Sequence, residues 1–220
     1  MRQFIFMLVG VVLFSCERNA DPDIQFHVID TDFSKGRLMF KQTIDLNDLV
    51  KFHGHLCDGL VVGAIAMDLT LKKLYPEGVI DRTNLRVVSK PSPCLTDVGA
   101  YLSGGRYQFN TFYVDTDFDG IYIVQRIDTE EAFSISMNTG VKPKAIDSLG
   151  GLAVKKELSA CKIDSLKKME DDFTDFLLSH EQPSNLFTVK KLKEFSWEPI
   201  LRNDFLKTDV LNKGKDVCSD

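Results

Sequence analysis

Apolar residues recur at helical spacing over the stretch 58–75, and Pro76 and Gly78 then end the pattern. A shorter amphipathic stretch lies just before it, and Asp45 is a suitable N-cap for a helix there. We therefore predict two consecutive helices. The residues that separate them lie at the N-terminus of the longer helix.

A third helix has clear signals at both ends. Ser92 is a good N-cap and Pro93 is a good first helical residue. Gly104 and Gly105 end the helix. The sequence therefore places Cys94 in the first turn of this helix.

Segments rich in alternating or β-branched residues predict strands at 84–89, 109–114, 121–127 and 132–137. We expect the last three strands to form an antiparallel meander. The residues that we expect in a sheet packed on the 58–75 helix are Tyr113, Ile121, Ile123 and Phe133.

The remaining chain is helical in pattern. Residues 152–180 form either one helix or two with a break near Cys161, and residues 181–220 are predicted to be helical and packed on the outside. The order of elements predicts an α+β fold, in which an antiparallel β-meander packs on helices and C-terminal helices follow.

The N-terminal residues predict export. Arg2 precedes an apolar run at 4–14, so residues 1–15 resemble a signal peptide, which is too short to span a membrane. Cys16 directly after Leu-Phe-Ser resembles a bacterial lipobox, in which the cysteine is acylated and becomes the first residue of the mature chain. The alternative is an ordinary signal peptide with a chance cysteine. Acylation would attach the protein to a bacterial membrane, facing the periplasm or the cell surface, without spanning it.

Composition narrows the class of protein. Removing residues 1–15 leaves 205 residues and changes the formal charge from −5 to −6, because Arg2 is lost. This length suits one domain, or one domain with an extension. A mildly acidic chain with no basic run is a poor candidate for binding nucleic acid.

Metal-ligating side chains are concentrated in FHGHLCDGL, residues 52–60, where His53, His55 and Cys57 are spaced two apart. Imidazole and thiolate together suit zinc or a related first-row ion. The motif lies at a helix N-terminus, which stabilises a thiolate. The small residues Gly59 and Gly63 allow another backbone to approach this helix closely.

The cysteines also allow other interpretations. With Cys16 acylated, four remain, and an even number in an oxidising compartment allows three disulfide connectivities, among which the sequence does not choose. Each thiol is alternatively a small buried apolar group. The four cysteines are Cys57, Cys94, Cys161 and Cys218.

The acidic segment 115–120 matches the opening of a calcium loop, Asp-x-Asp-x-Asp-Gly. The twelfth position of such a loop requires an acid, and Arg126 occupies it here. We therefore predict a polar turn between two strands.

Two motifs together resemble the FmdE family, which is named after formylmethanofuran dehydrogenase. FHGHLCDGL, with the following Gly63, resembles the family signature FHGHxCPG…G, and SPCLTDVGAYLSG at 92–104 resembles its C-x-x-D-A…G segment. The resemblance covers about residues 43–150 and implies an α+β core domain, commonly dimeric, with a Cys/His metal site built from both motifs. Carried over by position, the metal site residues are His53, His55, Cys57, Cys94 and Asp97.

This chain departs from the family pattern at three places. Asp58 replaces the proline after the motif cysteine and brings a carboxylate beside the site. Gly105 stands where the family usually has a cysteine, so one ligand or redox partner is lost. Cys161 and Cys218 are isolated, so the C-terminal zinc finger of some members is absent.

The chain thus divides into a signal peptide (1–15), a lipid-attached tether and N-terminal segment (16–42), an FmdE-like core (43–150) and a C-terminal helical extension (151–220). We predict an exported, lipid-anchored metal-binding protein, with a divalent transition metal, zinc first, as cofactor. A homodimer and a small-molecule ligand are expected partners.

Whether the protein catalyses a reaction is open, and the candidate catalytic residues are Cys57, Asp58 and Asp97. Asp97 alternatively ligates the metal, orients a histidine or lies on the helix surface. Two other functions are a non-catalytic protein that binds or delivers a metal or metal cofactor, and a thiol redox protein that uses Cys57 and Cys94.

Overall fold

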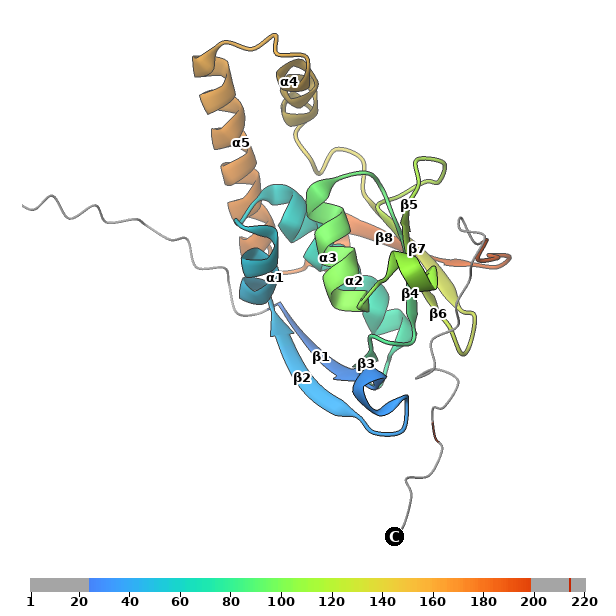
Figure 1. Ribbon diagram of the computed structural model, residues 1–220. Helices are drawn as coiled ribbons and strands as arrows, with labels where there is room; N and C mark the ends of the chain where they lie inside the picture. Colours follow the sequence, from blue (N-terminus) through green and yellow to red (C-terminus); the bar gives the residue numbers. More distant parts are fainter. Residues whose placement is uncertain (1–23, 199–213, 215–220) are drawn as a thin grey trace, which may run out of the picture.

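The computed structural model describes residues 24–198 and Gly214 (Figure 1). The predicted signal peptide, Cys16 and Cys218 lie outside the described residues. The helices are α1 (Leu46–His53), α2 (Asp58–Leu74), α3 (Pro93–Ser103), α4 (Lys144–Val154) and α5 (Ala160–Ser179), with short 3-10 turns η1 (Asp32–Ser34), η2 (Tyr107–Phe109) and η3 (Pro183–Leu186). The strands are β1 (Gln25–Asp30), β2 (Phe40–Asp45), β3 (Ile80–Asp81), β4 (Leu85–Ser89), β5 (Phe112–Val114), β6 (Tyr122–Arg126), β7 (Ala132–Met137) and β8 (Phe187–Leu192).

The described strands form two sheets. The smaller sheet has the order β2-β1-β3, with β1 antiparallel to β2 and parallel to β3. The larger sheet has five strands in the order β5-β4-β6-β7-β8, in which only β4 and β5 are parallel. The fold is therefore α+β, as predicted.

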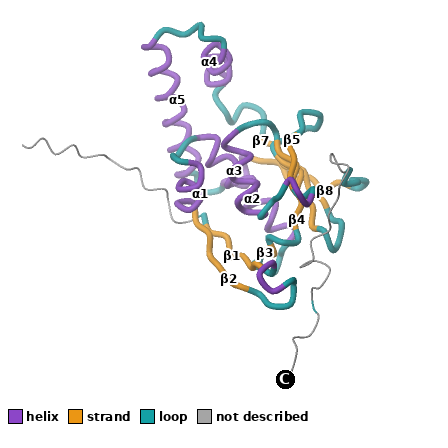
Figure 2. Tube along the Cα trace, viewed as in Figure 1, coloured by secondary structure: helices purple, strands orange, loops and turns teal. Residues whose placement is uncertain are grey.

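Helix α2 lies at the centre of the molecule, against α3, α5 and the larger sheet (Figure 2). Residues 59–67 of this helix are apolar or small all round, which is typical of a buried helix. The buried residues of α2 are Leu60, Val61, Gly63, Ala64, Ile65, Ala66, Met67, Thr70, Leu71 and Leu74. Helices α4 and α5 extend beyond the rest of the molecule (Figure 1). Among the described residues, no helix is both long and apolar enough to cross a membrane.

The predicted helix boundaries near the motifs are confirmed. Asp45 caps α1 through a reciprocal pair of hydrogen bonds with Asp48, and Ser92 caps α3 by accepting from the Leu95 N–H. Helix α3 ends at Gly104, which adopts a left-handed conformation with φ of 56°. These ends are set by neighbouring residues, which is why the sequence located them.

The predicted meander is partly wrong. Strand β5 does not pair with β6; it pairs in parallel with β4 at the sheet edge, while β6, β7 and β8 form the antiparallel run. Tyr113 and Ile123 belong to the sheet, but they pack with Trp197 on the face away from α2. Tyr122 is the neighbour that faces the α2 core.

The C-terminal region also differs from the prediction. Residues 187–192, predicted to be helical, form β8 and extend the larger sheet next to β7. Gly150 and Gly151 lie within α4, so this helix crosses the boundary that we predicted at residue 150. Helix α5 is confirmed, and the break before it covers residues 155–159. Segment 115–120 forms the predicted turn between β5 and β6.

Candidate metal centre

The motif FHGHLCDGL forms the sharp connection between α1 and α2. Helix α1 ends at His53, and Gly54 follows with φ of 102°, a conformation that favours glycine. Cys57 is the N-cap of α2, and its sulfur accepts from the Leu60 N–H at 3.4 Å. Because Gly54 turns the chain back here, the residues on either side of it are brought together.

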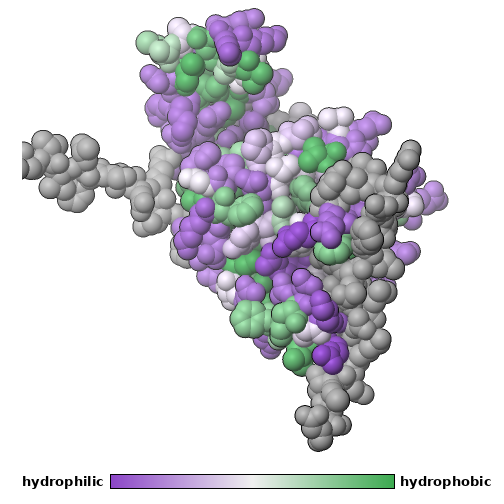
Figure 3. Space-filling view, in the orientation of Figure 1, coloured by the Kyte–Doolittle hydropathy of each residue, from purple (hydrophilic) through white to green (hydrophobic). Residues whose placement is uncertain are grey.

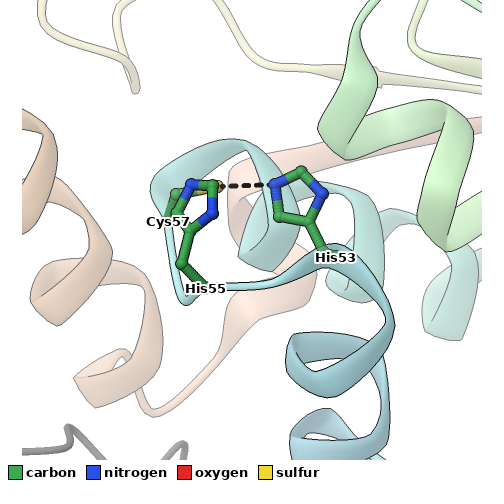
Figure 4. A group of neighbouring side chains, drawn as sticks. All are labelled: His53, His55 and Cys57. Atoms are coloured by element: carbon green, nitrogen blue, oxygen red, sulfur yellow. Dashed lines mark hydrogen bonds between the residues drawn. The ribbon is translucent and has the colours of Figure 1, made fainter.

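Three side chains of the motif converge (Figure 4). The rings of His53 and His55 lie 4.6 Å apart between centroids. His53 Nε2 lies 3.7 Å from Cys57 Sγ. One ligand atom from each of the three residues lies within 4.8 Å of the others, a group placed to hold a metal ion.

The second motif brings another thiol to the same place. Cys94, in the first turn of α3, has its sulfur 3.5 Å from that of Cys57. Both cysteines are free thiols at this distance. The structure therefore brings together both predicted cysteines with at least one predicted histidine, at the starts of two helices.

The close approach of α3 depends on Gly59. A Cβ atom added at this position would lie 2.9 Å from both Cβ and Sγ of Cys94. Gly63, one turn later, is as tightly packed, because its added Cβ would lie 2.8 Å from the Tyr122 hydroxyl. The predicted role of these small residues in close helix packing is confirmed.

Asp97 contacts a histidine rather than the cysteines. Its Oδ2 lies 2.8 Å from Nδ1 of His53, whose side chain is only 6% exposed. A carboxylate only accepts hydrogen bonds at neutral pH, so Nδ1 carries the proton and donates it. This tautomer leaves the Nε2 lone pair of His53 facing Cys57. Asp97 is thus a partner that orients the histidine, which is one of the roles predicted for it.

The two thiols share a hydrogen bond, which has opposite effects on them. Donation from Cys57 is the largest effect that lowers the pKa of Cys94 to about 6, although burial opposes it. The hydroxyl of Ser92 acts in the same direction. The same hydrogen bond, with burial, raises the pKa of Cys57 well above its usual value. The pair therefore readily loses one proton and retains the other.

Asp58 lies beside this group as the first residue of α2. Its Oδ2 is 3.9 Å from Nζ of Lys142, which also contacts Asp147 at 2.8 Å. The Asp58 carboxylate contributes to the raised pKa of Cys57. The described contact of Asp58 is thus with a lysine, and its negative charge affects the Cys57 thiol without a direct contact.

Sequence reasoning missed Tyr122. This tyrosine is fully buried on β6, and its hydroxyl donates to the Leu95 carbonyl at 2.7 Å. It thus ties the larger sheet to the first turn of α3, one residue after Cys94. No local pattern signals this contact, because residues far apart in sequence make it.

A cavity of about 680 Å³ lies elsewhere in the molecule, between α2 and the end of α5. Its lining includes Ile65, Asp68 and Leu177 and none of the motif residues. The group of thiols and imidazoles is therefore distinct from this cavity.

Comparison with known proteins matches this chain to a protein family and to solved structures. The family described as "FmdE, Molybdenum formylmethanofuran dehydrogenase operon" matches residues 52–188. The crystal structure of a tungsten formylmethanofuran dehydrogenase FmdE-like protein from Syntrophus aciditrophicus is 15% identical, with a TM-score of 0.41 over 69% of this chain and 74% of that chain. Among curated proteins, none matches this sequence.

Proposed function

We propose that this chain, which belongs to the FmdE family, binds a divalent transition metal through Cys57, Cys94, His53 and His55. The observation that carries the proposal is the convergence of His53, His55 and Cys57, joined by the Cys94 sulfur of the second motif, which lies 3.5 Å from that of Cys57. Zinc is the first candidate, because this donor set suits it.

The geometry fits such an ion. Zinc–thiolate bonds of about 2.3 Å in a tetrahedral site place two sulfurs about 3.8 Å apart. The 3.5 Å between Cys57 and Cys94 is close to that separation. Deprotonation also costs little at one of the two sulfurs, because the pKa of Cys94 is lowered to about 6.

Asp97 and His53 form the outer part of the proposed site. Metal-ligating histidines usually donate their second ring nitrogen to a carboxylate, which fixes the tautomer and makes the ligand more basic. The Asp97–His53 contact of 2.8 Å has this arrangement. It supports His53 as a ligand through Nε2.

His55 differs from the other donors because it is exposed to solvent. A small ligand that approaches from solvent therefore meets the site at this position. A bound divalent ion polarises such a ligand or lowers the pKa of a bound water. Asp58, which follows Cys57 in the chain, and Asp97, which contacts His53, are the candidates to accept a proton in a catalysed reaction.

The test is elemental analysis of the protein purified from its native source, combined with the Asp97→Asn variant. We expect about one transition metal ion for each chain and about tenfold weaker metal affinity in Asp97→Asn, the lower end of the range for such partners. Asp172→Asn on the exposed face of α5 is the matched control and is expected to bind like the wild type. Protein without metal, or equal affinities of both variants, contradicts the proposal.

A thiol redox function is the second candidate, favoured by the 3.5 Å separation of the two sulfurs. Cys57 and Cys94 would form a disulfide, and two electrons and two protons would pass to an oxidised disulfide of another protein. A Cys57–Cys94 bond in the purified protein supports this function. Thiols that are protected from alkylation until a chelator is added support the metal site.

We also propose that Cys16 is acylated and that the protein is a bacterial membrane lipoprotein facing the periplasm or the cell surface. The Leu-Phe-Ser-Cys sequence after an apolar run supports this localisation. The homodimer stays a prediction from the family resemblance.

Labelled fatty acid is expected to enter the wild-type chain and not Cys16→Ala, because acylation requires this thiol. Cys161→Ala, which removes an exposed thiol within the fold, is the control and should keep the label. Label that persists in Cys16→Ala excludes the lipobox interpretation.

A further inference from the structure

The connection between β1 and β2 exposes a group of large apolar side chains, which we call the apolar tip. Figure 3 shows hydrophobic residues at the lower end of the molecule, where Figure 1 places this connection. The members of the apolar tip, with their exposed fractions, are Phe33 (62%), Leu38 (48%), Met39 (66%) and Phe40 (57%). Single exposed apolar residues are ordinary, but four at one turn are not.

Hydrogen bonds hold the apolar tip in shape. The hydroxyl of Ser34 donates to the Leu38 carbonyl at 2.9 Å and accepts from the Leu38 N–H at 2.7 Å. The Gly36 N–H donates to the carbonyl of the buried Thr31. The rings of Phe33 and Phe40 meet edge to face, 6.2 Å apart. The bonded backbone therefore presents these side chains outward in a defined arrangement.

Basic residues surround the apolar tip. Lys35, Arg37 and Lys41 are exposed, and Asp32 is the one acid in residues 31–41. This positive charge is local, because the whole chain has a formal net charge of −5. Apolar side chains flanked by lysine and arginine fit the boundary between lipid head groups and acyl chains when the lipid is anionic.

We infer that the apolar tip inserts into the interfacial region of an anionic membrane and orients the body of the protein there. The short chain between Cys16 and Ile24 supports a membrane as the binding partner of the tip, provided that Cys16 is acylated as proposed. The eight steps along the chain from Cys16 to Ile24 span at most about 28 Å when extended. Strand β1 then carries the chain about 20 Å to the tip, so the tip reaches the same membrane.

This orientation has a consequence for the metal centre. Figure 1 shows the β1–β2 connection and the start of α2 at opposite ends of the body. A docked tip therefore holds the group of thiols and imidazoles away from the lipid, where a ligand in solution reaches it. Docking does not require metal, so the tip and the metal site are tested separately.

The experiment uses the full chain, purified from bacterial membranes and reconstituted into phosphatidylcholine vesicles with or without phosphatidylglycerol. Trp197 is the single tryptophan of the chain, so Trp197→Phe removes the background of tryptophan fluorescence. Phe40→Trp in this variant then places one fluorescent indole on the tip. Lipids brominated near the head group quench an inserted indole. Ile163→Trp in the same background is the matched control, because Ile163 is 49% exposed in the first turn of α5.

We expect the Phe40→Trp reporter to be quenched and blue-shifted in the anionic vesicles, and the Ile163→Trp reporter to be unaffected. Changing Lys35, Arg37 and Lys41 to glutamine should reduce the ratio of docked to undocked tip by about fivefold for each charge at low salt.

Three outcomes overturn the inference. In the first outcome, the chain does not float with the vesicles. In the second, the chain floats but the Phe40→Trp reporter is not quenched. In the third, the reporter is blue-shifted but not quenched by the brominated lipid, which would assign the tip to a contact with protein. Floating with an unquenched tip leaves the acylation of Cys16 intact, so the two proposals fail separately.

Discussion

Cys57→Ser is expected to abolish stable metal binding, with an affinity more than about a hundredfold below that of the wild type, or about 2.7 kcal/mol. A serine hydroxyl stays protonated at neutral pH and is a poor ligand for a borderline-soft ion. Cys57 also lies at the centre of the group, 3.5 Å from Cys94 Sγ and 3.7 Å from His53 Nε2. Elemental analysis and competition with a chromogenic chelator measure the loss.

The fold should survive this change. The core around α2 is large and apolar, and Cys57 packs only at its edge as a half-buried residue. Without metal the protein loses only the stabilisation that bound metal supplies by mass action. Circular dichroism should therefore show unchanged helix content and a lower Tm that added metal no longer raises.

Cys161→Ser is the matched control, because Cys161 is a free, exposed cysteine on α5 away from the group. It should bind metal like the wild type. Wild-type metal content in Cys57→Ser, or an equal loss in Cys161→Ser, would show that Cys57 is not a ligand. The cysteines would then be small buried groups that pack two helix N-termini together.

The sequence predicted the parts of the site that depend on local signals. An N-cap residue acts on the turn that contains it, so the start of α3 followed from Ser92. The start of α2 followed from the helical pattern that begins at Asp58. Placing Cys57 and Cys94 at these two starts made their convergence a reasonable expectation. The step from two helix starts to one shared site came from the family resemblance, which implies a metal site built from both motifs.

The pairing of distant strands was harder to predict. Strand β1 lies in the segment that we treated as tether and N-terminal segment (16–42), and β2 begins in it. Strand β8 lies in a region predicted to be helical. A short strand is stabilised by its partner rather than by its own sequence, and these partners are far along the chain. For the same reason no local pattern indicated that β5 pairs with β4 or that Tyr122 reaches Leu95.

The role of Asp97 shows the same limit within the site. Its spacing from Cys94 left three roles open, and the choice depended on where α1 ends relative to α3. Because His53 is the last residue of α1, its ring meets Asp97 across the helix pair. Tertiary packing, rather than the motif, decided that this carboxylate orients a histidine.

Gly59→Ala is expected to weaken metal binding by about a hundredfold, the loss that a misplacement of about 1 Å causes in catalytic sites. The new Cβ would lie 2.9 Å from both Cβ and Sγ of Cys94, so α3 must move away and take this sulfur with it. Metal titration measures the affinity, and the thermal unfolding of the metal-free protein measures the packing cost separately.

Two effects on the stability of the metal-free protein oppose each other. Replacing glycine by alanine inside a helix stabilises it by about 1 kcal/mol. Overpacking a tight contact costs about 1–3 kcal/mol, so we expect a net loss for Gly59→Ala. Gly150→Ala on α4 isolates the first effect, because nothing lies within 4 Å of its added Cβ. It should raise the Tm and leave metal affinity unchanged. If Gly59→Ala also raises the Tm and leaves metal affinity unchanged, then α2 and α3 are not in the close contact that brings Cys94 to Cys57. The metal centre would then have to use His53, His55 and Cys57 alone.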